Sequence, residues 1–143
     1  MNIYLAGPMR GYDLYNFTSF FAAAIALRRE GHTVHNPAEL DMSKGFNPAE
    51  PLDSEANAKV FNINDALRED FLIILREDTN AVVLLPGWRE SSGACAEVVV
   101  AKFSGTKVYE LKWLNKLVGG LPILERLEEQ PTVSFNTNIY DGV

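Results

Sequence analysis

Short apolar runs that stop at glycine or proline, each followed by a helical pattern, constrain this chain most strongly. Residues 81–85 (Ala-Val-Val-Leu-Leu) end at Pro86-Gly87, and residues 2–6 end at Gly7-Pro8. Apolar runs bounded by turn residues are typical of buried strands. Their alternation with helices indicates a parallel sheet with helices on both faces. We therefore expect a single-domain α/β fold, a Rossmann- or flavodoxin-like three-layer sandwich with a four- or five-stranded parallel sheet.

The expected elements follow from periodicity and from turn residues. Strands are expected at residues 2–6, 33–35, 81–85 and 106–110, and helices at about 15–30, 59–76, 92–103 and 121–129. The valine run at 98–100 favours a strand locally, but a Ser-Gly start and the stop at Gly105 favour a helix. Residues 37–57 form a long connection rich in proline and acids. Two interpretations of this segment stay open: a lid, binding loop or interface segment, and a disordered insertion.

Composition narrows the class of protein. The 143 residues, 47% hydrophobic, provide material for one core, so we expect one domain over 1–143, with a core at 1–111 and a C-terminal helix and tail at 112–143. The formal charge of −6 argues against a nucleic-acid polymer or an anionic membrane as partner. No apolar stretch reaches transmembrane length and no basic leader is present, so a soluble cytoplasmic protein is expected.

The chain has one cysteine, Cys95, and two histidines, His32 and His35. These residues have no metal-ligand spacing, so no metal and no cofactor are predicted. Neither histidine lies near Cys95 in the sequence, although the fold could bring them together. We interpret Cys95 as a small buried thiol that fills a helix seam.

Glu97 is the only carboxylate between Ser91 and Ala101, on an otherwise uncharged stretch of the expected helix. A glutamate on an apolar surface is costly unless it is paired or used. Gly93 and Ala94 precede it by four and three residues, share its helical face and leave room for a ligand. We interpret Glu97 as a functional residue. The alternative is a structural acid paired with an arginine or with backbone amides.

Two glycine-bearing loops, residues 7–11 and 86–93, follow the expected strands. In open α/β sheets ligands bind beyond the carboxyl ends of the strands, so we expect both loops to face one crevice. In the first loop, Gly7 permits close backbone approach and Arg10 offers an anion contact. The alternative is a tight turn with a solvated arginine, since the loop matches neither the dinucleotide fingerprint nor the P-loop.

The second loop and the preceding helix supply further candidates. The hydroxyls of Ser91 and Ser92 and the free amides of the first turn can face a ligand, or the serines only cap the helix. Trp88 can stack on an aromatic base or cover the core edge, and both stay open. Asp70 borders the apolar residues 71–75 and is the candidate partner carboxylate for Glu97.

Three segments together resemble the nucleoside 2-deoxyribosyltransferase superfamily: Tyr4-Leu-Ala-Gly-Pro-Met-Arg-Gly11, Arg68-x-Asp70, and Ser91-x-Gly93-x-x-Ala96-Glu97. That group includes the 2'-deoxynucleoside 5'-monophosphate N-glycosidases and small phage and bacterial proteins. The resemblance covers roughly residues 2–110, and Asp70 and Glu97 stand 27 residues apart, close to the spacing in the family. Residues 134–143 also resemble transferase tails that reach a neighbouring subunit's site.

The resemblance implies cleavage or exchange of the N-glycosidic bond of a (deoxy)nucleoside 5'-monophosphate or nucleoside by a retaining mechanism, with hydrolysis favoured over transfer. Glu97 would be the nucleophile at C1' of the sugar. Asp70 would hold a sugar hydroxyl or help to protonate the leaving base, and Tyr4 would line the pocket. Family sites commonly borrow residues across an interface, which implies a homodimer or a higher homo-oligomer.

The resemblance also implies a phosphate site. Arg10 with Gly11, and Ser91 with Ser92, would contact a 5'-phosphate. Ser91 stands where the nucleoside transferases carry an acid, and a hydroxyl suits a phosphate better than a carboxylate does. Pro8 stands where the hydrolases commonly have a serine, so one phosphate contact is missing.

Two other interpretations stay open. One is a non-catalytic nucleotide-binding or nucleotide-sensing protein on the same fold. The other is a ribohydrolase of the cytokinin-activating type, which carries Pro-Gly-Gly-x-Gly-Thr-x-x-Glu. Trp88 and the longer segment 89–92 depart from that pattern.

Overall fold

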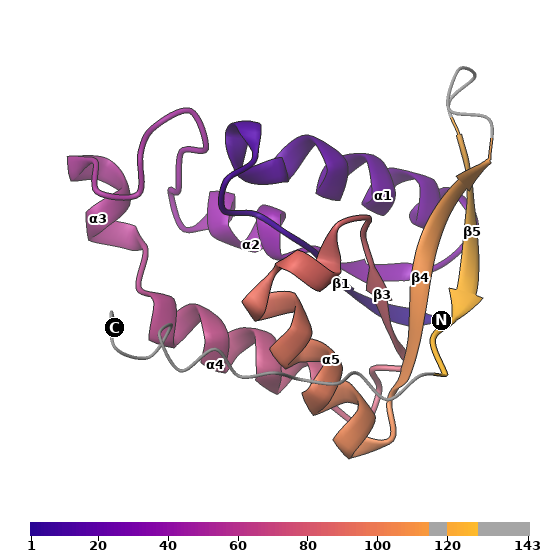
Figure 1. Cartoon of the computed structure of the whole chain (residues 1–143). Helices are drawn as coiled ribbons and strands as arrows, with labels where there is room; N and C mark the ends of the chain where they lie inside the picture. Colours follow the sequence, from indigo (N-terminus) through magenta and orange to yellow (C-terminus); the bar gives the residue numbers. More distant parts are fainter. Residues whose placement is uncertain (115–119, 129–143) are drawn as a thin grey trace.

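A five-stranded sheet forms the centre of the chain in the computed structural model, which describes residues 1–114 and 120–128 (Figure 1). Its strands, in the spatial order β2-β1-β3-β4-β5, are β1 (Asn2–Ala6), β2 (Thr33–His35), β3 (Ala81–Leu84), β4 (Lys107–Leu114) and β5 (Leu121–Arg126). β1 pairs in parallel with β2 and β3, and β3 pairs in parallel with β4. β5 is antiparallel to β4. The expected α/β sandwich is confirmed, with one antiparallel edge strand.

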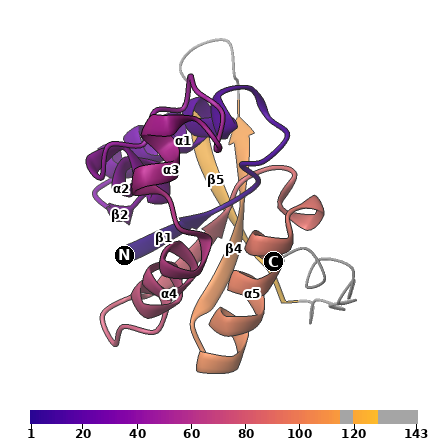
Figure 2. The ribbon, with the colours of Figure 1, turned by 90° about the vertical axis from the view of Figure 1, so that its left-hand side faces the viewer.

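Helices cover both faces of the sheet (Figures 1 and 2). One face carries α1 (Phe17–Arg29) and α2 (Pro37–Ser43), and the other carries α4 (Ile63–Ile74) and α5 (Ser92–Ser104). The short helix α3 (Glu55–Val60) precedes α4, and 3-10 turns η1 (Asp13–Asn16) and η2 (Trp88–Glu90) precede α1 and α5. Among the helices of the described ranges, none combines the length and the apolar character that crossing a bilayer requires.

The alternation of side chains along β1 separates two apolar cores. Ile3 and Leu5 point into the core beneath α1, and Tyr4 and Ala6 point into the core beneath α4 and α5. Successive strand residues face opposite sides of a sheet, so this register follows from the sequence Ile-Tyr-Leu-Ala. It places the hydroxyl-bearing residue Tyr4 on the side of the two helices that carry the candidate acids.

The strand order reverses between β1 and β3, because the chain leaves β1 toward β2 and returns on the other side of β1. Gly7 makes this approach possible: a Cβ atom added there would lie 2.8 Å from the Cβ of Leu85. The loops after β1 and β3 therefore start side by side. In this fold class, ligands bind at such a point.

The expectation for residues 37–57 needs correction, because the segment is neither a plain loop nor a disordered insertion. Pro37 opens α2, and the side-chain oxygen of Asn36 caps it by accepting from the Ala38 amide at 3.0 Å. An asparagine cap followed by proline at the first helical position is a helix start. The buried amide of Asn57 secures the connection by donating to the carbonyls of Asn47, Glu50 and Pro51.

The single helix expected at 59–76 is also wrong. α3 ends at Val60, Phe61 and Asn62 are extended, and α4 begins at Ile63. The Asn62 side chain accepts from the amides of Asn64 and Asp65 and so starts a new helix. The hydrophobic spacing did not predict this break, because Val60 before it and Ile63 after it are both partly buried apolar residues.

The expected final helix at 121–129 is wrong in type. Residues 121–126 form β5, which pairs with β4 from Tyr109 to Leu114. Pro122 lacks a backbone N–H, and an edge strand such as β5 tolerates this because one of its sides has no partner strand to receive hydrogen bonds. The tail at 134–143, with its resemblance to transferase tails, lies outside the described residues.

Candidate active site

Three side chains from separate elements meet on the α4–α5 side of the sheet. Tyr4 lies in β1, Asp70 in α4 and Glu97 in α5. Tyr4 is 1% exposed and Glu97 is 8% exposed, whereas Asp70 is half-buried. The three residues proposed from the sequence as the catalytic group therefore lie together.

Tyr4 connects the two acids. Its phenol makes side-chain hydrogen-bond contacts with both the Glu97 and the Asp70 carboxyl groups. The Oε2 atom of Glu97 is buried and has no hydrogen-bond partner within the described residues. No arginine, lysine or histidine in residues 1–114 and 120–128 forms an ion pair with Glu97 or Asp70. The alternative of an arginine-paired structural acid does not fit this arrangement.

Burial sets the protonation of the group. It raises the pKa of Glu97 to about 8, the Asp70 carboxyl adds to this rise, and the Tyr4 hydrogen bond opposes it. Burial also raises the pKa of Asp70 to about 7. The pKa of Tyr4 is raised by burial and by both acids, so its hydroxyl remains a donor. Both raised pKa values keep the Glu97 and Asp70 carboxyls partly protonated near neutral pH.

Small residues lie between this group and the carboxyl edge of the sheet. Ala6 follows Tyr4 on the same face of β1, and Ala94 and Gly93 lie one helical turn before Glu97. A Cβ added at Gly93 would have Ser91 Oγ, at 4.0 Å, as its nearest neighbour within the described residues. Space therefore remains beside the face of α5 that carries Glu97.

The two glycine-bearing loops meet, as expected from the sequence. Gly87 has a φ of +85°, and a Cβ added there would lie 2.6 Å from the Tyr12 hydroxyl and 3.4 Å from Pro8. The first loop thus rests on the second through a position that only glycine fits. Arg10 and Gly11 are exposed at the tip of the first loop.

The start of α5 offers donors. Ser91 Oγ caps the helix by accepting from the Ala94 amide at 3.2 Å, and Ser92 is exposed. The first amides of a helix, here those of Ser92 and Gly93, have no acceptor within the helix. Capping and anion binding are compatible, because the Ser91 hydroxyl can still donate.

Trp88 lies in the core instead of at the crevice. It is 5% exposed, and its Nε1 donates to Glu110 Oε1 at 2.8 Å. The Arg89 guanidinium lies over its ring, 4.5 Å from the centroid. This position fits the interpretation that Trp88 covers the core edge, and it leaves no open ring face for a base to stack on.

Cys95 is half-buried, and its thiol contacts the carbonyl oxygens of Trp88 at 3.7 Å and Arg89 at 3.5 Å. Burial raises the pKa of this thiol. A raised pKa makes a poor nucleophile, which agrees with the interpretation of Cys95 as a packing residue.

The sequence analysis missed a polar group next to Asp70. Asp41 on α2 is half-buried, burial raises its pKa to about 6, and it adds to the raised pKa of Asp70. Lys44, just after α2, forms an ion pair with Glu69 on α4. The signal that could have revealed Asp41 is the Asn36-Pro37 helix start, which places it on a helix that packs near α4.

Two cavities lie away from the three residues. One, of about 690 Å³, lies on the α1 side, and the other, of about 680 Å³, lies between α2 and α4. Neither is lined by Tyr4, Asp70 or Glu97.

Comparison with protein families gave one result. A family model described as a domain of unknown function, DUF4406, matches residues 1–110. The chain belongs to this family. The match runs from β1 into the first half of β4 and includes both helices that carry the acids, so all three residues of the group lie inside the family domain. No curated protein and no solved structure matched the chain. The family description names no activity, so function is argued from the site.

Proposed function

We propose that the chain cleaves or exchanges the N-glycosidic bond of a (deoxy)nucleoside 5'-monophosphate or nucleoside, with Glu97 as nucleophile. One observation carries the proposal. Glu97 is only 8% exposed, and its Oε2 atom has no hydrogen-bond partner among the described residues. The carboxyl lies beside the hydroxyl of Tyr4 and the second acid, Asp70. Burying an unpaired acid costs stability, so such an acid is retained where chemistry uses it. The resemblance to the nucleoside 2-deoxyribosyltransferase superfamily supports the same roles.

The chemistry balances with these residues. A Glu97 oxygen bonds to C1' as the C1'–N bond breaks, and the bond electrons pass to the base nitrogen. This step requires Glu97 as the carboxylate and Asp70 in its protonated form, and Asp70 gives its proton to the leaving base. Water then attacks C1', releases the Glu97 carboxylate and returns a proton to Asp70. A second base in place of water completes an exchange.

Substrate recognition is proposed at the carboxyl edge of the sheet. Arg10, Gly11 and the start of α5 at Ser91 and Ser92 would receive the 5'-phosphate, because exposed arginine and free helix amides bind anions. Gly93 would leave space for the sugar, and Gly7 lets the loops after β1 and β3 approach each other. The assembly would be a cytoplasmic homodimer or larger, in which a neighbouring subunit excludes water and so decides between hydrolysis and exchange.

A second function rests on the raised pKa of Glu97. Burial raises the pKa of Glu97 to about 8, so its carboxyl is largely protonated near neutral pH in the free protein. A protonated carboxyl donates a hydrogen bond and does not attack. That state fits a non-catalytic protein that binds a nucleotide.

The test is incubation with a panel of ribo- and deoxyribonucleoside monophosphates and nucleosides, scored by chromatography for free base. The proposal expects base release by the wild-type chain and loss of release in Glu97→Gln. The matched control is Glu77→Gln, since Glu77 is exposed and lies beyond the far end of α4. Binding without base release across the panel would favour the binding protein.

A further inference from the structure

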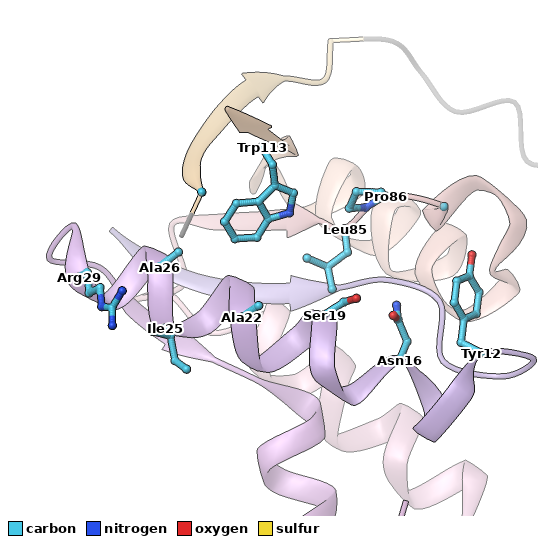
Figure 3. A pocket seen from close by; sticks show the side chains of 12 residues that line it. Tyr12, Asn16, Ser19, Ala22, Ile25, Ala26, Arg29, Leu85, Pro86 and Trp113 are labelled. Atoms are coloured by element: carbon cyan, nitrogen blue, oxygen red, sulfur yellow. The ribbon is translucent and has the colours of Figure 1, made fainter. Parts of the chain in front are cut away.

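A cavity of about 690 Å³ lies on the α1 side of the sheet (Figure 3). Tyr4 lies on the opposite side of the sheet, in the core beneath α4 and α5. Its walls are the outer face of α1, the turn after β3 and the end of β4. Small-molecule sites in proteins have volumes of roughly 300–1,000 Å³. The cavity therefore has the size of a ligand site, and the proposed glycosidic chemistry does not use it.

The cavity has the form of a slot. Trp113 lies above a row of small α1 side chains, Ser19, Ala22 and Ala26 (Figure 3). These positions recur at three- and four-residue spacing, so they share one helical face. Gly120 lies against the Trp113 ring, where an added Cβ would be 2.8 Å from Trp113 Cε3. A flat ring fits between an indole and a floor of methyl and hydroxymethyl groups.

The two ends of the slot are polar. Arg29 lies at one end and Tyr12 at the other (Figure 3). The neighbouring Arg28 pairs with Glu39, whereas Arg29 has no acidic partner among the described residues. In a chain of net charge −6, an arginine left without an acid beside an aromatic slot is a local anion site.

The Tyr12 end is held in an unusual backbone conformation. Leu14, Tyr15 and Asn16 have positive φ angles of 50°, 54° and 61°. Residues with a Cβ rarely adopt this region. The Asn16 side chain, which lines the cavity, is fixed by its Nδ2 donating to the Pro8 carbonyl at 2.9 Å. The lining at this end is therefore formed before any ligand binds.

We propose that this slot binds a small planar aromatic anion, with its ring between Trp113 and the α1 face and its acidic group at Arg29. The site is separate from the carboxyl pair, since the sheet lies between them. The proposal does not depend on glycosidic activity, so either can fail without the other.

The test uses 8-anilinonaphthalene-1-sulfonate, an aromatic sulfonate, titrated into the full chain while its fluorescence and that of tryptophan are recorded. Saturable binding of one probe per chain is expected. Ala22→Leu should abolish it, because leucine fills the slot, and folding should survive because Ala22 is exposed. Arg29→Gln should weaken it roughly tenfold, as expected for loss of one charge-assisted contact.

A control variant, Arg68→Gln at an exposed arginine on α4, should leave binding unchanged. Equal affinity of the wild type and Arg29→Gln, or of the sulfonate and an uncharged naphthalene, would overturn the anion assignment. Probe binding that survives Ala22→Leu would place the probe elsewhere and overturn the site. Loss of binding as the chain dimerises at higher concentration would instead make the slot a surface for a second copy.

Discussion

The Tyr4 hydroxyl on β1 and the Glu97 carboxyl on α5 are hydrogen-bonding partners in the core between the sheet and helices α4 and α5. This contact offsets only part of the cost of burying the acid, because the pKa of Glu97 still stands at about 8. Both the stability of the fold and the ionisation of Glu97 should therefore depend on pH and on the Tyr4 hydroxyl.

Glu97→Gln should stabilise the protein at alkaline pH. The folded pKa of Glu97, about 8, exceeds its ordinary value of 4.5, so the folded state binds a proton that the unfolded state has lost. The free energy of unfolding therefore falls as pH rises from about 4.5 to about 8, and glutamine removes this loss. Urea unfolding should show a gain of at least about 1 kcal/mol at pH 8.5 and a smaller one at pH 5.

Glu77→Gln serves as the control for that experiment, since Glu77 is exposed and lies beyond the end of α4. A Glu97→Gln protein less stable than the wild type at pH 8.5 would show that the carboxylate is held by contacts this account does not include.

Tyr4→Phe should shift the dependence of base release on pH. The Tyr4 hydrogen bond lowers the pKa of Glu97, so its loss raises that pKa and moves the acidic limb to higher pH. We expect base release at pH 7 to fall by roughly 10- to 100-fold, and to recover in part by pH 9. Rates of base release measured from pH 5.5 to 9.5 locate the acidic limb of the profile directly. An acidic limb at the same pH in both proteins would mean that Tyr4 does not affect the ionisation of Glu97.

Enlarging Gly93 should block the space beside Glu97. Its nearest neighbour within the described residues is 4.0 Å from an added Cβ, so Gly93→Ala should fold and bind almost normally. Gly93→Val places two further methyl groups in that space, and we expect the KM to rise at least about tenfold. The melting temperature of both variants controls for folding. A normal KM in Gly93→Val would mean that substrate approaches Glu97 by another route.

Arg10→Gln should distinguish nucleotides from nucleosides. The guanidinium is exposed at the tip of the loop after β1, where the 5'-phosphate is proposed to bind. We expect the KM for monophosphates to rise roughly tenfold and the KM for nucleosides to stay unchanged. Lys107→Gln, an exposed cation at the start of β4, is the control. Equal effects on both substrate classes would assign Arg10 to a role other than phosphate recognition.

Much of the fold was readable from local sequence. The Ser91 cap and the left-handed Gly105, with a φ of +79°, bound α5 as expected and override the strand preference of the valines at 98–100. The helix at 37–43 was missed because Asn36-Pro37 was taken only as a strand end. β5 was missed because its partner is β4, and such pairing is not encoded within residues 121–126 themselves.

The site was readable to a similar degree. Helical spacing placed Glu97 on one face with Gly93 and Ala94, whereas Tyr4 was indicated only by the family resemblance. The position of Trp88 depended on its hydrogen bond to Glu110, which lies 22 residues away on β4. Asp41 was missed because it nears Asp70 only through the packing of α2 near α4.

Covalent trapping tests the central claim most directly. A nucleoside monophosphate with fluorine at the sugar 2'-position slows release of the glycosyl-enzyme, because fluorine destabilises the oxocarbenium-like transition state. Intact-mass and peptide mass spectrometry should then find the substrate mass less its base on Glu97, and no adduct in Glu97→Gln. An unmodified wild-type chain, or an adduct on any other residue, would contradict the account.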